Sequence, residues 1–199
     1  MTPSSSTLHF LAAHQHEYGY IVRQPEDEIA VINMVLGAEF AGVRAMTGTS
    51  GGGFALMNET LALAGITEIP AVIFLAQRPG PATGMPTWTE QGELAYSIYA
   101  GHGEFLKIVL APGDLEEAFR LTADAFNLAE RYQTPVIILS DKYLGESAMT
   151  TAVFDQNKIS IDRGEIVEAN KLRKLTNFQR YEITKNGISP RSLPGNENG

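Results

Sequence analysis

The sequence predicts an α/β fold in which a parallel sheet is covered by helices on both faces. Short apolar and β-branched runs alternate with longer segments of helical periodicity. The runs at 71–76 and 136–140 are almost wholly apolar, as expected for strands buried on both sides. Alternation of this kind joins parallel strands by right-handed crossovers, so the loops that follow the strands share one edge of the sheet.

The individual elements follow from the same patterns. Strands are expected at 20–23, 43–48, 71–76, 106–110 and 136–140, and helices at 4–17, 27–41, 52–65, 114–132 and near 90–99. The helix at 27–41 is apolar or small at nearly every position, which predicts enclosure on most sides and therefore a partner surface. The helix at 114–132 has one apolar and one charged face, as an ordinary covering helix has.

The length of 199 residues and the 44% hydrophobic content predict one main domain, which we place at 1–149. From 150 to 199 the apolar runs shorten and Lys and Arg increase, so this part is expected to be an extended arm or linker to a further C-terminal domain. The chain also starts at a helix-capping segment with no strand before it. Both ends are therefore expected to lie within a longer polypeptide.

Charge and composition exclude several function classes. Residues 1–149 carry 7 basic and 17 acidic residues, and this net charge of −10 argues against nucleic acid or an anionic membrane as a partner. The sequence has no long uncharged apolar run and no signal peptide, so a cytoplasmic location is expected. Cysteine is absent, which excludes disulfides and the usual iron–sulfur ligands. No metal site is expected, because no ligand spacing joins the four histidines, His9, His14, His16 and His102.

A glycine-rich loop, Thr47-Gly48-Thr49-Ser50-Gly51-Gly52-Gly53, lies between an apolar run and a helix. Its backbone N–H groups could receive an anion, but it matches neither common nucleotide-binding glycine motif. The alternative is a tight turn that needs positive φ and close helix packing.

The apolar run at 71–76 is followed by Gln77 and then by Arg78, so Arg78 emerges at the carboxyl end of a buried strand. A guanidinium there can hold a carboxylate by two parallel hydrogen bonds. The alternative is a structural salt bridge to a nearby acid. Three prolines in the following loop are expected to fix the positions of Thr83 and Thr87.

Glu26, Asp27 and Glu28 open the apolar helix. Acids in a first helical turn complement the helix dipole whatever the function of the protein. Glu28, however, leads directly into IAVINMVLG, where its carboxyl is a candidate for proton exchange in a desolvated site.

Several segments together resemble the alpha subunit of 2-oxoacid:ferredoxin oxidoreductases, most closely the 2-oxoglutarate type. They are MTPSSS, QPEDEIAVINMVLGAEFAG, MTGTSGGGFALMNE, IPAVIFLAQRPGPATGMPTWTEQGEL, HGE, PVIILSDKYLGES and RYEITKNGISPRSLPG. The resemblance covers nearly the whole chain. It implies the thiamine-diphosphate-binding fold, and specifically the domain that binds the pyrimidine ring of the cofactor.

The resemblance also implies roles for individual residues. Glu28 matches the glutamate that hydrogen-bonds the aminopyrimidine, and Arg78, with Thr87, matches the pair that binds the substrate carboxylate. Thr2 matches a threonine that contacts the substrate, although the two residues that precede it in the family motif are absent here. Thr49, Ser50 and Gly51 fall in a family element at the cofactor site.

The implied reaction is the oxidative decarboxylation of a 2-oxoacid to an acyl-coenzyme A, with electrons passing to ferredoxin. The likeness to the 2-oxoglutarate type implies 2-oxoglutarate as the 2-oxoacid. No Gly-Asp-Gly element for magnesium and diphosphate is present. The resemblance therefore implies a hetero-oligomer in which a beta subunit supplies the diphosphate, Mg and iron–sulfur sites. Two alternatives stay open: the pyrimidine domain of another thiamine-diphosphate enzyme, and a non-catalytic Rossmann-like binding module.

Overall fold

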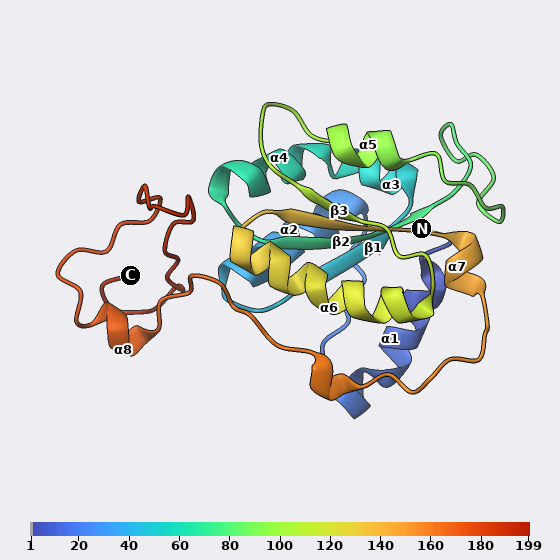
Figure 1. Ribbon diagram of the computed structural model, residues 1–199. Helices are drawn as coiled ribbons and strands as arrows, with labels where there is room; N and C mark the ends of the chain where they lie inside the picture. The colour runs from blue at the N-terminus through green and yellow to red at the C-terminus, as the bar shows by residue number, and fades with distance from the viewer. Residues whose placement is uncertain (1) are drawn as a thin grey trace.

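The sheet has four parallel strands in the order β1-β2-β4-β3. The structure, a computed structural model, describes residues 2–199; Met1, the first residue of the predicted domain, lies outside the described residues. The strands are β1 (Met46–Thr49), β2 (Ala71–Gln77), β3 (Ile108–Leu110) and β4 (Pro135–Asp141). Helices lie on both faces of the sheet, which confirms the predicted fold class (Figure 1).

The two central strands, β2 and β4, pair along seven residues, from Ala71 opposite Pro135 to Gln77 opposite Asp141. Every side chain of β4 is buried. Burial on both faces explains why these two strands are the ones that the sequence predicts most closely.

The outer strands begin later than predicted, because the residues before them are bonded elsewhere. The backbone N–H of Ala45 donates to Glu39 Oε1 at 2.9 Å, so β1 starts only at Met46. The carbonyl of Leu106 accepts a hydrogen bond from Thr134 Oγ1, and β3 starts at Ile108.

The predicted strand at 20–23 is wrong. Helix α1 (Ser5–Tyr18) ends at Gly19, and residues 20–23 form no regular structure. Ile21 is 77% exposed, and the N–H of Val22 donates to the side chain of Gln15 rather than to a neighbouring strand. The β-branched residues there have no strand to pair with, so propensity alone does not form one.

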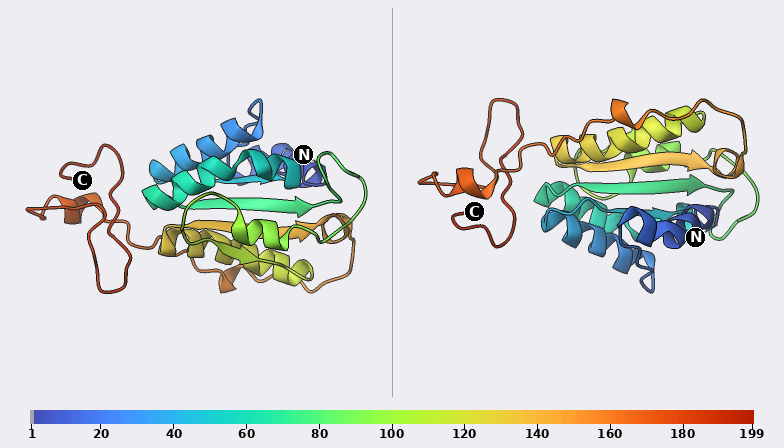
Figure 2. Two further views of the ribbon diagram at one scale, coloured as in Figure 1. Left: turned by 90° about the horizontal axis from the view of Figure 1, so that it is seen from above. Right: turned by 90° about the horizontal axis from the view of Figure 1, so that it is seen from below.

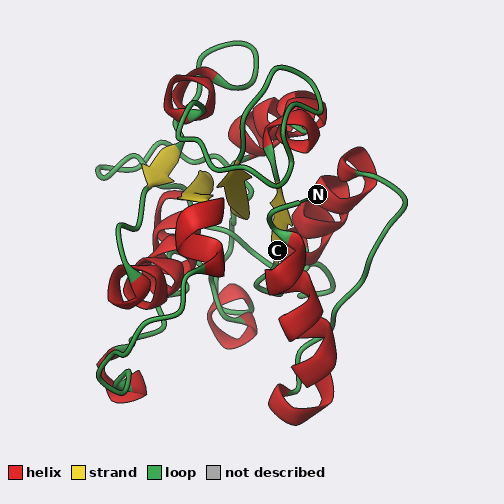
Figure 3. Cartoon of the chain, turned by 90° about the vertical axis from the view of Figure 1, so that its right-hand side faces the viewer, coloured by secondary structure: helices red, strands yellow, loops and turns green. Residues whose placement is uncertain are grey.

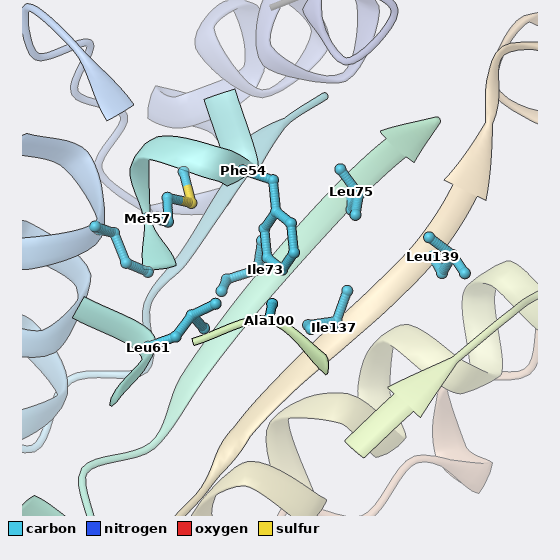
Figure 4. Packing of buried hydrophobic residues seen from close by; sticks show 9 residues of the cluster. Phe54, Met57, Leu61, Ile73, Leu75, Ala100, Ile137 and Leu139 are labelled. Atoms are coloured by element: carbon cyan, nitrogen blue, oxygen red, sulfur yellow. The ribbon is translucent and has the colours of Figure 1, made fainter. Parts of the chain in front are cut away.

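The first face of the sheet is covered by α2 (Glu28–Phe40), α3 (Gly51–Leu56), α4 (Asn58–Thr67) and α5 (Leu94–Tyr99). The predicted helix at 52–65 is divided at Met57, whose N–H bonds to the carbonyl of Phe54 in a tight i to i−3 turn. Phe54, Met57 and Leu61 consequently all enter one core cluster with the side chains of β2 and β4 (Figure 4).

Helix α2 packs Ile32, Val35 and Leu36 inward but leaves Ile29 and Met34 about half exposed. The predicted enclosure on most sides is therefore not achieved within this chain.

The opposite face is covered mainly by α6 (Leu115–Tyr132), which is capped by Asp114 and buries Ala125 and Ala129 against the sheet. Figure 3 shows helices above and below the strands seen end-on. Helix α1 and the short α7 (Lys142–Glu146) lie at the end of the sheet where the strands finish.

Residues 150–199 contain only two short elements, η1 (Gln156–Lys158) and α8 (Ala169–Leu172), and a bridge between Ile166 and Arg191. Figure 2 shows their last part beyond the amino ends of the strands, away from the loop at 78–93. The division of the chain into a domain at 1–149 and an arm at 150–199 stays a prediction.

Candidate active site

The candidate residues gather at the carboxyl ends of β1 and β2. Thr49 ends β1 and Ser50 follows it, while Gln77 ends β2 and Arg78 follows it. The two strands are parallel neighbours, so these four residues lie at one edge of the sheet. This is the usual position of a ligand site in an open α/β sheet.

The Glu28 carboxyl is held at this edge by Thr49. Helix α2 starts at Glu28, because the Asp27 side chain caps it by accepting from the N–H of Ala30 at 2.7 Å. Thr49 Oγ1 then donates to Glu28 Oε1 at 3.2 Å. The structure therefore brings together two residues that lie 21 positions apart in the sequence.

Gly53 makes the approach of Glu28 possible. A Cβ atom at this position would overlap Thr49 Oγ1 and lie 2.5 Å from Glu28 Oε1. Gly51 has the same function for a different acid, since a Cβ there would overlap Glu93 Oε1. The tight-turn interpretation of this loop required glycine for close packing, and Gly51 and Gly53 provide it by allowing Glu93 and Glu28 to approach the backbone. The expected positive φ is wrong for this loop, because none of its glycines adopts one.

Ser50 is completely buried at 0% exposure, and its Oγ has no hydrogen-bond partner among residues 2–199. A buried hydroxyl without a partner is costly unless a ligand completes it. Ser50 therefore fits a residue that contacts a bound molecule.

Arg78 is only 5% exposed, yet only one of its donors is used within the described chain. Its Nη1 donates to the carbonyl of Thr2 at 2.8 Å, while Nε and Nη2 have no partner among residues 2–199. No carboxylate of the described residues forms an ion pair with it. The alternative of a structural salt bridge is therefore wrong, and a carboxylate from a ligand would satisfy the free donors.

Thr2 and Thr87 are placed differently. The half-buried Thr2 meets Arg78 through its backbone carbonyl. Thr87 is exposed in the loop after Arg78, and no described contact joins it to Arg78 or Glu28. That loop is folded on itself, since the N–H of Met85 donates to the carbonyl of Pro79 and that of Trp88 to the carbonyl of Met85.

Sequence reasoning missed Glu93 and Gln77. The Glu93 N–H donates to Gln77 Oε1 at 2.9 Å, which fixes Glu93 beside Arg78. Burial raises the pKa of the Glu93 carboxyl to about 7, although the positive charge of Arg78 opposes the shift and Glu90 adds to it. The available signal was a polar residue, Gln77, at the end of an otherwise apolar strand.

Residues 1–192 match the family described as pyruvate flavodoxin/ferredoxin oxidoreductase, thiamine diphosphate-binding. The chain belongs to this family. The Glu28 carboxyl beside Gly53, together with the unpartnered donors of Ser50 and Arg78, fits a domain that binds one part of thiamine diphosphate.

Individual relatives agree with the family. The chain is 45% identical over 209 residues to 2-oxoacid:ferredoxin oxidoreductase 1, subunit alpha, of Sulfurisphaera tokodaii, a match that covers 98% of this chain and 33% of the relative. It is 45% identical over 153 residues to the 2-oxoglutarate synthase subunit KorA of Archaeoglobus fulgidus, covering 77% of this chain and 44% of the relative. The chain thus spans about a third of the length of the first of these curated relatives.

A solved structure supports the same assignment. The 2-oxoglutarate:ferredoxin oxidoreductase of Magnetococcus marinus, solved with 2-oxoglutarate, coenzyme A and succinyl-CoA bound, is 40% identical and superposes with a TM-score of 0.93. The match covers 100% of this chain and 34% of that one. The predicted thiamine-diphosphate-binding fold is confirmed.

Two further observations concern membranes and metals. None of the helices within residues 2–199 is both long and apolar enough to cross a membrane. Within the same residues, no group of three or more His, Asp or Glu side chains is arranged to hold a metal ion.

Proposed function

We propose that this chain is the pyrimidine-side part of the alpha subunit of a 2-oxoacid:ferredoxin oxidoreductase. In this role it takes part in the oxidative decarboxylation of a 2-oxoacid to an acyl-coenzyme A, with the electrons passing to ferredoxin. The observation that carries the proposal is Arg78, a buried guanidinium with two free donors at the same sheet edge as the Glu28 carboxyl.

In the proposed site, Glu28 binds the aminopyrimidine ring of thiamine diphosphate and holds a proton at its carboxyl, while Thr49 fixes the orientation of that carboxyl. Bound thiamine diphosphate supplies the carbon nucleophile and the electron sink for decarboxylation. Ser50 and Gly51 border the cofactor, with the buried Ser50 hydroxyl as the available hydrogen-bonding group.

Arg78 holds the carboxylate of the 2-oxoacid through its free Nε and Nη2 groups. Its third donor is bonded to the Thr2 carbonyl, so Thr2 positions the guanidinium and borders the substrate. For Thr87 the proposal requires the exposed loop at 79–92 to bring the hydroxyl toward the bound substrate.

The partner is a beta subunit that provides the diphosphate, Mg and iron–sulfur sites and passes electrons to ferredoxin. The absence of cysteine from all 199 residues supports the placement of the clusters outside this segment. We place the assembled enzyme in the cytoplasm and propose 2-oxoglutarate as the substrate. The bound ligands of the Magnetococcus marinus protein and the name of the Archaeoglobus fulgidus relative support that substrate.

Glu28→Gln in the reconstituted full-length complex tests the proposal. We expect 2-oxoglutarate-dependent reduction of a viologen dye to fall by roughly 100-fold or more, the range for removal of an acid–base group. Glu26→Gln, an exposed acid just before the same helix, is the matched control and should retain activity. Unchanged activity of Glu28→Gln contradicts the proposal and favours a non-catalytic module. If the wild-type complex reduces the dye with pyruvate but not with 2-oxoglutarate, the proposed substrate is wrong and pyruvate takes its place.

A further inference from the structure

Glu93 has a fixed backbone. It lies immediately before α5, where its N–H donates to Gln77 Oε1 at 2.9 Å. Its carbonyl accepts from the N–H and the Oγ of Ser97, each at 2.8 Å. The residue is therefore tied to both β2 and α5, and its carboxyl lies against Gly51 at the start of α3.

The Glu93 carboxyl occupies the space that a side chain at Gly51 would fill. Its Oε2 is shielded from solvent but has no hydrogen-bond partner among residues 2–199. Loss of both water and partner is costly for a carboxyl group, whether it is charged or neutral. An acid is held at this position although nothing described in the chain completes its bonding.

The neighbouring unpartnered groups belong to the same sheet edge. They are Ser50 Oγ, on the residue before Gly51, and Arg78 Nε and Nη2, on the residue after Gln77. Ser50 and Arg78 are each more than nine-tenths buried. The guanidinium affects Glu93 through its charge but forms no ion pair with it within 4.0 Å. A ligand bound to Arg78 would therefore meet a second polar wall made by Glu93 and Ser50.

The charges around Glu93 determine its protonation when an anion binds. Burial raises its pKa to about 7, with Arg78 opposing and Glu90 adding to the shift. The other titratable groups on the adjoining elements are Tyr96 on α5, Asp141 at the end of β4 and Glu28 at the start of α2. A carboxylate bound to Arg78 would offset the only positive charge near Glu93 in the described chain. Loss of that net positive charge favours the neutral form of Glu93.

We propose that Glu93 is a second substrate-binding residue, which takes up one proton as the 2-oxoacid binds and donates a hydrogen bond from Oε2 to the bound oxoacid. The assignment rests on the proposed function, because it requires a 2-oxoacid at Arg78. This role of Glu93 adds a pH-dependent hydrogen-bond donor to the same site as the Arg78 guanidinium.

The test is the pH dependence of KM for 2-oxoglutarate in the full-length complex, from pH 6 to pH 9. For the wild-type complex we expect KM to rise above pH 7 and to approach a tenfold increase per pH unit, because the ionised carboxylate must regain its proton. Glu93→Gln keeps a neutral donor and should show a KM nearly independent of pH. Glu93→Ala should show a raised KM at every pH. Glu116→Gln, an exposed acid on α6 that is not among the groups that shift the pKa of Glu93, should retain the wild-type pH profile.

Calorimetric titration in two buffers of different ionisation enthalpy provides a readout that does not depend on turnover. At pH 8 it should record uptake of about one proton per oxoacid bound by the wild-type complex and none by Glu93→Gln. A KM of Glu93→Gln that rises in parallel with that of the wild type, or an unchanged KM for Glu93→Ala, overturns the role of Glu93 alone. A wild-type complex that neither binds nor reacts with any 2-oxoacid overturns the proposed function as well.

Discussion

The two ends of the parallel sheet differ in how their buried polar and charged side chains are paired. At the carboxyl end, Ser50, Arg78 and Glu93 keep polar atoms that have neither a hydrogen-bond partner nor an ion-pair partner among residues 2–199. At the amino end, Glu130 is 1% exposed and lies within ion-pair distance of three arginines: Arg44 at 2.6 Å, Arg163 at 2.7 Å and Arg191 at 3.7 Å. The last two contacts are close in distance but lack hydrogen-bond geometry.

The tail supplies much of the amino-end network. Arg163 and Arg191 lie in residues 150–199, and Arg191 Nη1 also donates to the carbonyl of Glu39 at 2.9 Å. Arg180 joins the same end through Glu68 at 2.7 Å and Gln133 at 2.9 Å. Charges at this end hold two segments of the chain together, whereas those at the other end form no ion pair within residues 2–199, as the proposed ligand site requires. Substitutions should accordingly affect stability at the amino end and function at the carboxyl end.

The largest expected effect is that of Glu130→Ala. It leaves three arginines around a buried site without their shared acid, and loss of one partner from a buried ion cluster costs about 3–5 kcal/mol in the free energy of unfolding. Urea unfolding measures the change, with the exposed Glu116→Ala on the same helix as the control. A loss below about 1 kcal/mol would mean that the network does not stabilise the fold.

Arg78→Lys should have the next largest effect, and on binding rather than folding. An ammonium group lacks the planar pair of donors, so KM for the 2-oxoacid should rise roughly 100-fold. The free energy of unfolding should change by less than about 1 kcal/mol, because only one hydrogen bond, to Thr2, ties the guanidinium to the described chain. Steady-state kinetics and urea unfolding separate the two effects, with the exposed Arg23→Lys as the control. A large loss of stability with an unchanged KM would show instead that Arg78 stabilises the fold and does not bind the substrate.

The smallest effect concerns the pH dependence of stability at the amino end. Burial raises the pKa of the Glu39 carboxyl to about 7 from 4.5, with the negative charge of Glu130 adding to the shift and Arg191 opposing it. The folded state therefore binds this proton more tightly than the unfolded state, so the free energy of unfolding falls as pH rises from about 4.5 to about 7.

Glu39→Gln should remove this contribution while keeping an oxygen for the N–H of Ala45. Between pH 5 and pH 8 we expect the wild type to lose about 1–2 kcal/mol more than the variant does. The shift at Glu93 has the same sign but is common to both proteins. Urea unfolding at pH 5 and pH 8 measures the change in the free energy of unfolding. An equal change in the wild type and in Glu39→Gln would contradict the assignment of the raised pKa to Glu39.

Sequence reasoning succeeded where one local pattern determines the structure. The run at 71–77 is apolar throughout its length until Gln77, so both strand β2 and the placement of Arg78 at its end could be predicted. The segment at 20–23 has similar residues but no pairing strand, and pairing depends on distant parts of the chain. The same limit applies to the break at Met57, which depends on how Phe54 and Leu61 enter the core.

Groups that meet across the fold were not predictable. Arg44 and Glu130 lie 86 positions apart, and nothing in either local sequence indicates the contact. Glu93 reaches Gly51 only because Gln77 fixes the intervening loop. Glu28 was predicted as a site residue from its place at the start of an apolar helix and from the family resemblance, whereas its bond to Thr49 required the structure.

The contact between Glu93 and Gly51 also couples these two positions sterically. A side chain at position 51 would occupy the volume of the Glu93 carboxyl, so a Cβ there displaces the flexible end of Glu93. A substitution at Gly51 therefore changes the shape of this wall of the site through residue 93, without any substitution at position 93 itself.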